Sequence, residues 1–211
     1  MTRNGIKRDV ILSAAQKVFA RHGYHDARTS DIAREAGVAE GTLYNYFPSR
    51  EDIFLCLFED RWKSFTEGVR RKTSTLTDPN DKLKAIFAAA MKLFGRSRPL
   101  SQIFLMETSP SSLFFNSRVA GPLADFLDLI ESILIEGKRS GKYHPDLDTR
   151  VARMAVYGIA QSVLFAWTMK EKAPPDIRRR FRFSMLKASR TIKIILKSGL
   201  TAPAASGKDL A

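Results

Sequence analysis

The stretch that most constrains this chain is Thr29–Phe47, TSDIAREAGVAEGTLYNYF. Its apolar residues recur at helical spacing in two short segments, about 31–36 and about 40–46. Gly37 lies between them, at a position where a helix that ends with a positive φ favours glycine. Two short helices joined by a three- or four-residue turn with a glycine are typical of a helix-turn-helix.

The outward face of the second segment bears on what this pair does. It carries small, hydroxyl, phenol and amide side chains: Gly41, Thr42, Tyr44, Asn45 and Tyr46. The alternative is an ordinary helical hairpin inside a larger bundle, whose solvated face would usually carry charged residues such as Glu and Lys. Hydroxyl and amide groups suit phosphates and base edges, so the pattern favours DNA recognition.

Composition excludes several classes of protein. The 211 residues are 44% hydrophobic and include 14 Phe, which is enough for a core. Cys56 is the single cysteine, so a disulfide framework and a cysteine-rich metal site are excluded. The three histidines show no metal-ligand spacing, and no Ser/His/Asp or Cys/His arrangement is visible. We therefore expect no catalytic residues, no metal and no cofactor.

The N-terminus lacks the apolar run of a signal peptide, and no segment of the sequence is apolar enough to span a membrane. The expected location is the cytoplasm. The formal net charge of +13 permits a polyanionic partner. However, residues 1–50 hold eight basic and five acidic residues, against ten and two in residues 170–200. The motif rather than the total charge therefore supports DNA binding.

Helical periodicity continues along the chain and predicts an all-α protein. A first helix spans 6–22 and ends at Gly23, and Thr29 or Ser30 would cap the next one. Further helices are expected at 50–73, 79–95, between Pro99 and Pro110, from Gly121-Pro122 to about 141, at 149–171, and from Pro174-Pro175 to about 197. We expect a DNA-binding domain at 1–50, linked by helix 50–73 to a ligand-binding and dimerisation domain at 51–199, with a flexible tail at 200–211.

The run from Ile11 to Leu57 resembles the N-terminal domain of TetR-family transcriptional regulators. The matching features are ILSAAQKVF, the following GY, TSDIAREAGV, GTLYNYF and SREDIF. The resemblance implies an all-α fold of about nine or ten helices with an N-terminal three-helix domain that binds DNA. It also implies a C-terminal domain that binds a small inducer and forms a homodimer through the last two helices.

Residue by residue, the resemblance implies phosphate contacts from Thr29, Tyr44, Tyr46 and Arg50, and major-groove contacts from Gly41, Thr42 and Asn45. Ser30 offers a further hydroxyl at the same helix start, where a phosphate can be received. Leu43 and Phe47 would be buried. Glu40 departs from many relatives, which carry Lys there. A carboxylate repels phosphate but can accept a hydrogen bond from cytosine N4, so the contact at Glu40 is left open.

The segment ILIEGKRSGKYHPDLDTRVARMAVYGIAQSVLFAWTM, together with AEGTLYNYF, is similar to the FadR-like branch of the family, which implies a long-chain acyl-CoA ligand. SQIFLMETSPSSLFFNSR lacks an arginine expected after Glu107, which leaves Arg118 as the nearest candidate for a nucleotide phosphate. A different apolar or aromatic inducer, such as an efflux substrate, is the alternative. The candidate pocket residues, whose spacing core packing also explains, are Phe87, Met91, Phe94, Phe104, Arg118, Phe126, Ile130, Tyr157, Gln161 and Phe165.

The expected last helix pairs an apolar stripe with a basic one. A buried face beside a solvated face explains this arrangement, and so would a membrane-surface helix or attraction of an anionic ligand. We favour the first explanation, with the apolar stripe in a four-helix dimer interface. The candidate interface residues are Val163, Trp167, Phe181, Met185, Ala188 and Ile192.

Together these patterns predict a homodimeric DNA-binding regulator that does not act as an enzyme. Its partners would be a double-stranded, palindromic operator and a small apolar or acyl-CoA-type inducer that releases it, as from a repressor. A basic amphipathic protein that binds lipid or a membrane surface is the less favoured alternative, since it rests on the last helix alone.

Overall fold

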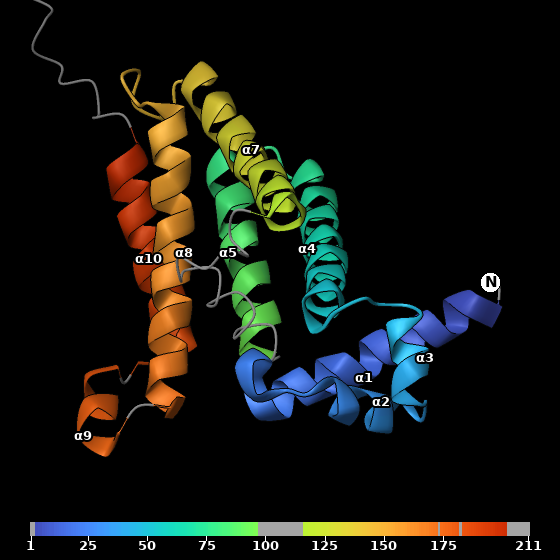
Figure 1. The fold of residues 1–211 in the computed structure, drawn as a ribbon. Helices are drawn as coiled ribbons and strands as arrows, with labels where there is room; N and C mark the ends of the chain where they lie inside the picture. Colours follow the sequence, from blue (N-terminus) through green and yellow to red (C-terminus); the bar gives the residue numbers. More distant parts are fainter. Residues whose placement is uncertain (1–2, 97–115, 173, 182, 202–211) are drawn as a thin grey trace, which may run out of the picture. The chain divides into compact units, whose positions relative to one another are not determined.

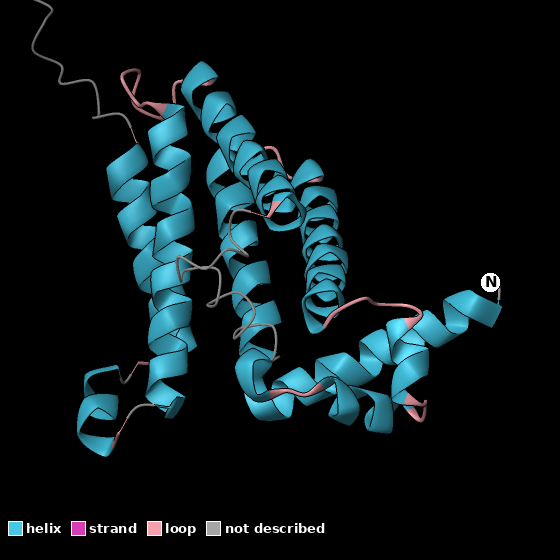
Figure 2. Ribbon diagram, viewed as in Figure 1, coloured by secondary structure: helices cyan, strands magenta, loops and turns pink. Residues whose placement is uncertain are grey.

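The computed structural model describes residues 3–96, 116–172, 174–181 and 183–201. Within these ranges it has nine α-helices, one short 3₁₀-helix and no strand (Figure 2). One isolated β-bridge joins Tyr143 and Thr201. The predicted all-α class is therefore confirmed. The helix expected between Pro99 and Pro110 lies outside the described residues. Of the tail expected at 200–211, only Leu200, the last residue of α10, and Thr201 are described.

The chain divides into two units, one of residues 1–65 with 94–123 and one of residues 66–93 with 124–211. These units are defined by their internal contacts, so the functional domain boundary expected at residue 50 stays a prediction. The first unit contains α1 (Arg3–Asp26), α2 (Thr29–Ala36), α3 (Glu40–Tyr44) and the first part of α4 (Arg50–Ser74) (Figure 1). The start of α7 (Ser117–Arg139) also belongs to it.

The core of the first unit follows from the apolar stripes of its helices. α1 contacts α2, and α2 contacts α3. The buried side chains include Ile11, Ala15, Val18, Phe19, Ile32, Leu43, Phe47, Ile53 and Phe54. On the surface, Glu35 of α2 accepts bonds from Lys17 and Arg21 of α1 at 3.0 and 2.8 Å. These two cations lower the pKa of Glu35.

Two helix ends in this unit differ from prediction. Gly23, with φ 78° and ψ 167°, breaks the helical conformation as expected, but helical residues resume and α1 extends to Asp26. The predicted caps Thr29 and Ser30 are wrong, because α2 already begins at Thr29 and Arg28 occupies the cap position in an extended conformation. The reason is local: the Arg28 carbonyl accepts the first two bonds, from the N–H groups of Asp31 and Ile32.

The start of α7 ties to α4 within the first unit. The Trp62 indole N–H donates to the Pro122 carbonyl oxygen at 2.7 Å, and the Trp62 ring stacks on Phe58 with 5.6 Å between centroids. The prediction that this helix begins at Gly121-Pro122 is wrong. Asn116 starts it earlier, since its carbonyl accepts bonds from Val119 and Ala120 and its side chain accepts one from Arg118.

The second unit contains the rest of α4, most of α5 (Pro79–Arg96) and the rest of α7. These are followed by α8 (Thr149–Lys172), α9 (Pro175–Arg178), the 3₁₀-helix η1 (Arg179–Phe181) and α10 (Met185–Leu200). α8 contacts α9, η1 and α10. The single helix expected from Pro174-Pro175 to residue 197 is therefore wrong. Ser184 starts a new helix, because its carbonyl and hydroxyl accept bonds from Ala188 and Lys187, so the apolar and basic stripes are not continuous.

Tyr143 packs the loop that follows α7 against the end of that helix, in the second unit. Its ring is 1% exposed and packs against Gly137 of α7, where a Cβ atom would lie 2.0 Å from a ring carbon. The N–H groups of Lys142 and Tyr143 both donate to the Gly137 carbonyl, after Gly141 turns the chain with φ 68°. Burial, reinforced by Asp78 and Glu136, raises the pKa of the Tyr143 phenol.

Candidate nucleic-acid interface

α2 and α3 are held at a fixed angle by a short, well-bonded turn. Gly37 ends α2 with φ 67°, and the Val38 N–H donates back to the Ala33 carbonyl at 3.0 Å. α3 has only five residues, too few to be stable alone in water. Leu43 and Phe47, both buried as predicted, anchor it, and the Leu43 carbonyl accepts bonds from the Tyr46 and Phe47 N–H groups.

The outward side chains of α3 and its C-terminal extension form a polar surface. Gly41, Tyr44 and Asn45 are exposed, and Thr42 and Tyr46 are half-buried. Among the other predicted contact residues, Ser30 is exposed and Thr29 and Arg50 are half-buried. The structure therefore brings the predicted residues to the surface of one unit, although their contacts with DNA stay a prediction.

Thr29 links the starts of the two helices. Its hydroxyl donates to the Glu40 carboxylate at 2.8 Å and lies 3.2 Å from the Tyr44 phenol oxygen. This network connects the first residue of α2 with the first and last residues of α3. The sequence left the role of Glu40 open, and the structure gives it a partner within the protein.

An open hollow of about 530 Å³ lies beside this network. Its lining comes from the connection before α2, the start of α2, the end of α3, the turn before α4 and the start of α4: Ala27, Arg28, Thr29, Ser30, Tyr44, Pro48, Ser49 and Arg50. Two guanidinium groups and several hydroxyls thus surround a space large enough for a phosphate. Anionic groups are favoured there, because the N-terminus of α2 also faces this side of the unit through Thr29 and Ser30.

Arg50 contributes to this surface in a way the sequence did not indicate. Its Nη1 donates to the carbonyl oxygens of His25 and Ala27, at 3.0 and 2.9 Å, and its guanidinium lies 4.6 Å from the centre of the Tyr24 ring. Burial raises the pKa of the Tyr24 phenol, and Arg50 partly opposes that shift. Arg50 therefore fixes the connection between α1 and α2 whether or not it also touches a phosphate.

We expect Arg50→Lys to lower the free energy of unfolding by roughly 1–3 kcal/mol, because a single ammonium cannot reproduce the bonds to two carbonyls and the stacking on Tyr24. Urea denaturation followed by circular dichroism measures this change. Arg28→Lys is the matched control, since Arg28 is exposed and lines the same hollow. Equal losses in both variants would contradict a structural role specific to Arg50.

The start of α4 carries a second charged cluster, which includes Arg118. The Ser49 hydroxyl accepts the Asp52 N–H at 3.0 Å and donates to the Asp52 carboxylate, which caps the helix as predicted. Arg118 donates twice to Glu59, at 2.6 and 3.0 Å, once to Asp52 at 3.4 Å, and lies 3.0 Å from the Cys56 sulfur. Glu59 is the main cause of its raised pKa. A ligand phosphate would have to compete with two carboxylates for Arg118.

The other predicted pocket residues lie mostly in the core of the second unit. Phe87, Met91, Phe126, Ile130 and Tyr157 are buried, Gln161 donates to the Tyr157 phenol oxygen at 2.9 Å, and Phe165 is exposed. Phe104 and the side chain of Phe94 lie outside the described residues. Most of these residues are therefore core residues of the second unit, and their contact with a ligand stays a prediction.

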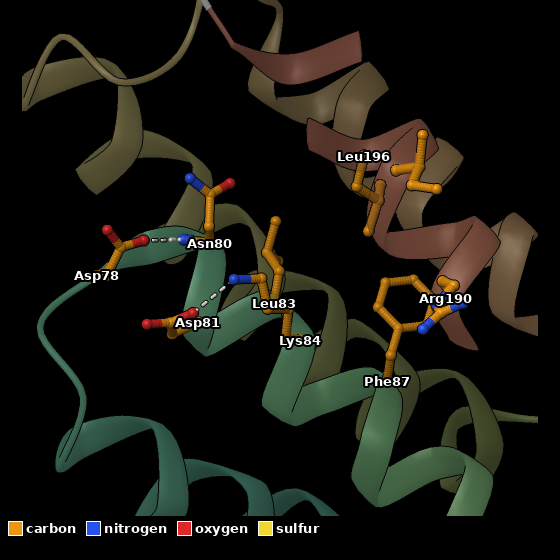
Figure 3. Close-up of a pocket in the computed structure, with 9 residues that line it drawn as sticks. Asp78, Asn80, Asp81, Leu83, Lys84, Phe87, Arg190 and Leu196 are labelled. Atoms are coloured by element: carbon orange, nitrogen blue, oxygen red, sulfur yellow. Dashed lines mark hydrogen bonds and ion pairs between the residues drawn. The ribbon is translucent and has the colours of Figure 1, made fainter. Parts of the chain in front are cut away.

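A separate hollow of about 460 Å³ lies between α5 and α10 of the second unit (Figure 3). Leu83 and Phe87 of α5 and Leu196 of α10 face it, and Arg190 lies beside Phe87 (Figure 3). Of the predicted pocket residues, Phe87 alone is among those that line it: Asp78, Asn80, Asp81, Leu83, Lys84, Phe87, Arg190, Ile194 and Leu196.

The predicted interface residues divide into two groups. Val163 and Trp167 are half-buried, whereas Ala188 and Ile192 are buried within a single chain. The side chains of Phe181 and Met185 lie outside the described residues. The apolar side chains that α8 and α10 expose are different ones: Val151, Met154, Phe165, Leu186, Ile194 and Ile195. Helical spacing did not single them out, because it identifies an apolar face without showing which residues of that face a neighbouring helix covers.

Comparison with known proteins agrees with this geometry. Residues 11–57 match the family model for bacterial regulatory proteins of the tetR family, and residues 58–180 match the model for the C-terminal region of YsiA-like proteins. A solved structure of the fatty acid degradation regulator FadR from Bacillus halodurans is 31% identical, with a TM-score of 0.77, over 90% of this chain and 94% of that one. The chain belongs to the TetR family.

Matches in sequence and in structure to a TetR-family regulator of Bacillus subtilis also cover most of its length. The fatty acid metabolism regulator protein of Bacillus subtilis is 28% identical over 190 residues, which cover 90% of this chain and 93% of the relative. The crystal structure of FadR from Bacillus subtilis in complex with stearoyl-CoA is 28% identical, with a TM-score of 0.77, over 90% of this chain and 97% of that one.

Membership of the TetR family makes this chain a ligand-responsive transcriptional regulator that binds DNA, and not an enzyme. α2 and α3 are the helix-turn-helix of that family, and most of the residues that match the C-terminal family model lie in the second unit. Among the described residues, no helix combines the length and the apolar run needed to cross a membrane.

Proposed function

We propose that this protein is a homodimeric repressor that leaves a palindromic operator when a long-chain acyl-CoA binds its second unit. The observation that carries the proposal is the exposed polar face of α3, held by the buried Leu43, beside a hollow with two guanidinium groups. Phosphates would be received at that hollow, and Gly41, Thr42 and Asn45 would face base edges. Such a regulator acts in the cytoplasm, where the chromosome lies.

Exposed apolar residues support the dimer. Leu186 is 81% exposed, and five further apolar side chains of α8 and α10 are exposed with it. α8 contacts α10 within one chain, so the two helices together present an apolar surface to a second copy. A two-fold dimer would carry two recognition helices, which read half-sites roughly 34–36 Å apart on a palindrome.

The ligand class is supported by two independent facts. Aromatic and aliphatic side chains make up most of the core of the second unit, and within it Gln161 donates to the Tyr157 phenol oxygen. The relatives from Bacillus subtilis and Bacillus halodurans are fatty acid regulators of similar length, and FadR from Bacillus subtilis was solved with stearoyl-CoA. The ligand would release DNA only to the extent that it binds the DNA-free arrangement more tightly.

We expect stearoyl-CoA to lower the affinity for a selected operator at least tenfold, whereas free CoA has no effect. The operator comes from selection on random duplexes, and fluorescence anisotropy measures binding at one fixed salt concentration. Sedimentation of the complex should give two chains per duplex. Asn45→Ala should alter the selected sequence, while Ser30→Ala should weaken all duplexes alike.

Each part of the proposal has its own contrary result. Failure to enrich any duplex would refute DNA recognition by α3. A single chain on the selected duplex would refute the dimer, and an affinity that no acyl-CoA of any chain length changes would refute the ligand class. Tighter binding on addition of stearoyl-CoA would refute release by this ligand.

A further inference from the structure

Glu40, Thr29 and Tyr44 form a hydrogen-bonded chain whose direction is fixed. A carboxylate can only accept, so the Thr29 hydroxyl donates its one hydrogen to Glu40 across 2.8 Å. At 3.2 Å the Tyr44 phenol must then be the donor to the Thr29 oxygen. Both hydroxyl hydrogens therefore point along the chain towards Glu40 in the free protein.

This direction matters when DNA approaches, because phosphate oxygens also only accept. Thr29 can donate to a phosphate only after its hydrogen has turned away from Glu40. The Glu40 carboxylate, which is exposed at the first residue of α3, then needs another donor. The first residues of a recognition helix are those that reach base edges in the major groove.

Base edges offer a carboxylate few donors in the major groove. The exocyclic amino groups of cytosine (N4) and adenine (N6) are the donors there, and adenine places its N7 acceptor next to N6. That lone pair repels a carboxylate, whereas an amide can satisfy both adenine atoms at once. Cytosine is consequently the base whose edge suits Glu40.

We propose that Glu40 reads one cytosine in each half-site and that Thr29 holds its carboxylate in place until DNA binds. The inference rests on the proposed DNA-binding function and adds a specificity-determining residue to it. Glu40 also disfavours duplexes without that cytosine, because its negative charge then lies unpaired near the phosphates. Glu40 thus favours binding to sites with that cytosine and disfavours binding to sites with another base there.

The test is selection from a random duplex pool by four proteins at one salt concentration: the parent, Glu40→Ala, Glu40→Gln and Thr29→Val. We expect one C·G pair per half-site in the parent motif, with roughly tenfold weaker binding when that pair is replaced. Glu40→Ala should lose this preference and keep the rest of the motif. Glu40→Gln should shift the preference to A·T, because glutamine pairs with adenine N6 and N7.

The remaining variants separate base reading from simpler roles. Thr29→Val should weaken all duplexes alike and keep the C·G preference. If Glu40 acted only by positioning Thr29, the Thr29→Val protein would lose the C·G preference as well. Glu67→Ala, which removes an exposed carboxylate outside the helix-turn-helix, controls for charge and should leave the motif unchanged. An unchanged motif in Glu40→Ala overturns this inference while DNA binding stands. If no protein enriches a motif, the proposed function itself fails.

Discussion

Leu43→Ala is expected to lower the free energy of unfolding by roughly 2–5 kcal/mol and to abolish binding to the selected operator. Leu43 is fully buried, and its backbone carbonyl accepts the bonds that turn the chain after α3. Because α3 is only five residues long, its position depends on this burial rather than on helix propensity. Thermal and urea unfolding measure stability, and fluorescence anisotropy measures operator binding.

The control for Leu43→Ala is Val10→Ala in α1 of the same unit. Val10 is 44% exposed, so its truncation should change stability by less than about 0.5 kcal/mol and leave operator binding intact. The interpretation of Leu43 as the anchor of α3 would be wrong if the Leu43→Ala protein bound the operator as tightly as the parent at a temperature where both are folded.

Gly137→Ala is expected to destabilise the second unit by roughly 1–3 kcal/mol, although alanine normally favours a helix over glycine. The added methyl group would lie 2.0 and 2.2 Å from two carbons of the Tyr143 ring. That ring is buried and cannot move aside without losing the contacts at the end of α7. For a chain of this size the melting temperature should fall by several degrees.

Gly121→Ala provides the matched control because it makes the same substitution in the same helix, α7, where no atom lies within 4 Å of the new Cβ. It should leave stability unchanged or raise it by up to about 1 kcal/mol. Tyr143→Leu combined with Gly137→Ala should recover part of the loss. If Gly137→Ala melted at or above the parent temperature, the close approach of the ring to Gly137 would be disproved.

The helix-turn-helix could be predicted from sequence because its determinants are local. Gly37 stands one residue after the last apolar position of α2 and takes the positive φ that its place indicates. The apolar spacing that predicted burial of Leu43 and Phe47 acts within a single turn of helix. Such short-range constraints hold whatever the rest of the chain does.

Side-chain partners were harder to predict, because they depend on residues far apart in the chain. Arg50 bonds carbonyls 25 and 23 residues away, and Arg118 bonds a carboxylate 59 residues away. The family resemblance implied a phosphate contact for Arg50, and Arg118 was the nearest arginine to the one expected for a nucleotide phosphate. Nothing in the local sequence indicates that protein carbonyls or carboxylates are near enough to bind them first.

The break before α10 shows a different limit. The apolar spacing from Ile177 to Ile195 continues across the break, so periodicity alone predicts one helix. Ser184 was an available helix-start signal, because serine is a favoured residue at the N-cap position. A helix-start residue inside a stretch of helical periodicity therefore indicates a second helix, even where the apolar spacing continues.

The buried indole of Trp62 gives this protein an internal optical probe. Its N–H bond to the Pro122 carbonyl and its stacking on Phe58 place the chromophore where α4 meets the start of α7. Trp167 is the only other tryptophan, so Trp167→Phe leaves an emission spectrum from this one site. Breaking that bond or admitting water would shift the emission to longer wavelength. Conformational change at this contact can therefore be followed in real time without a label.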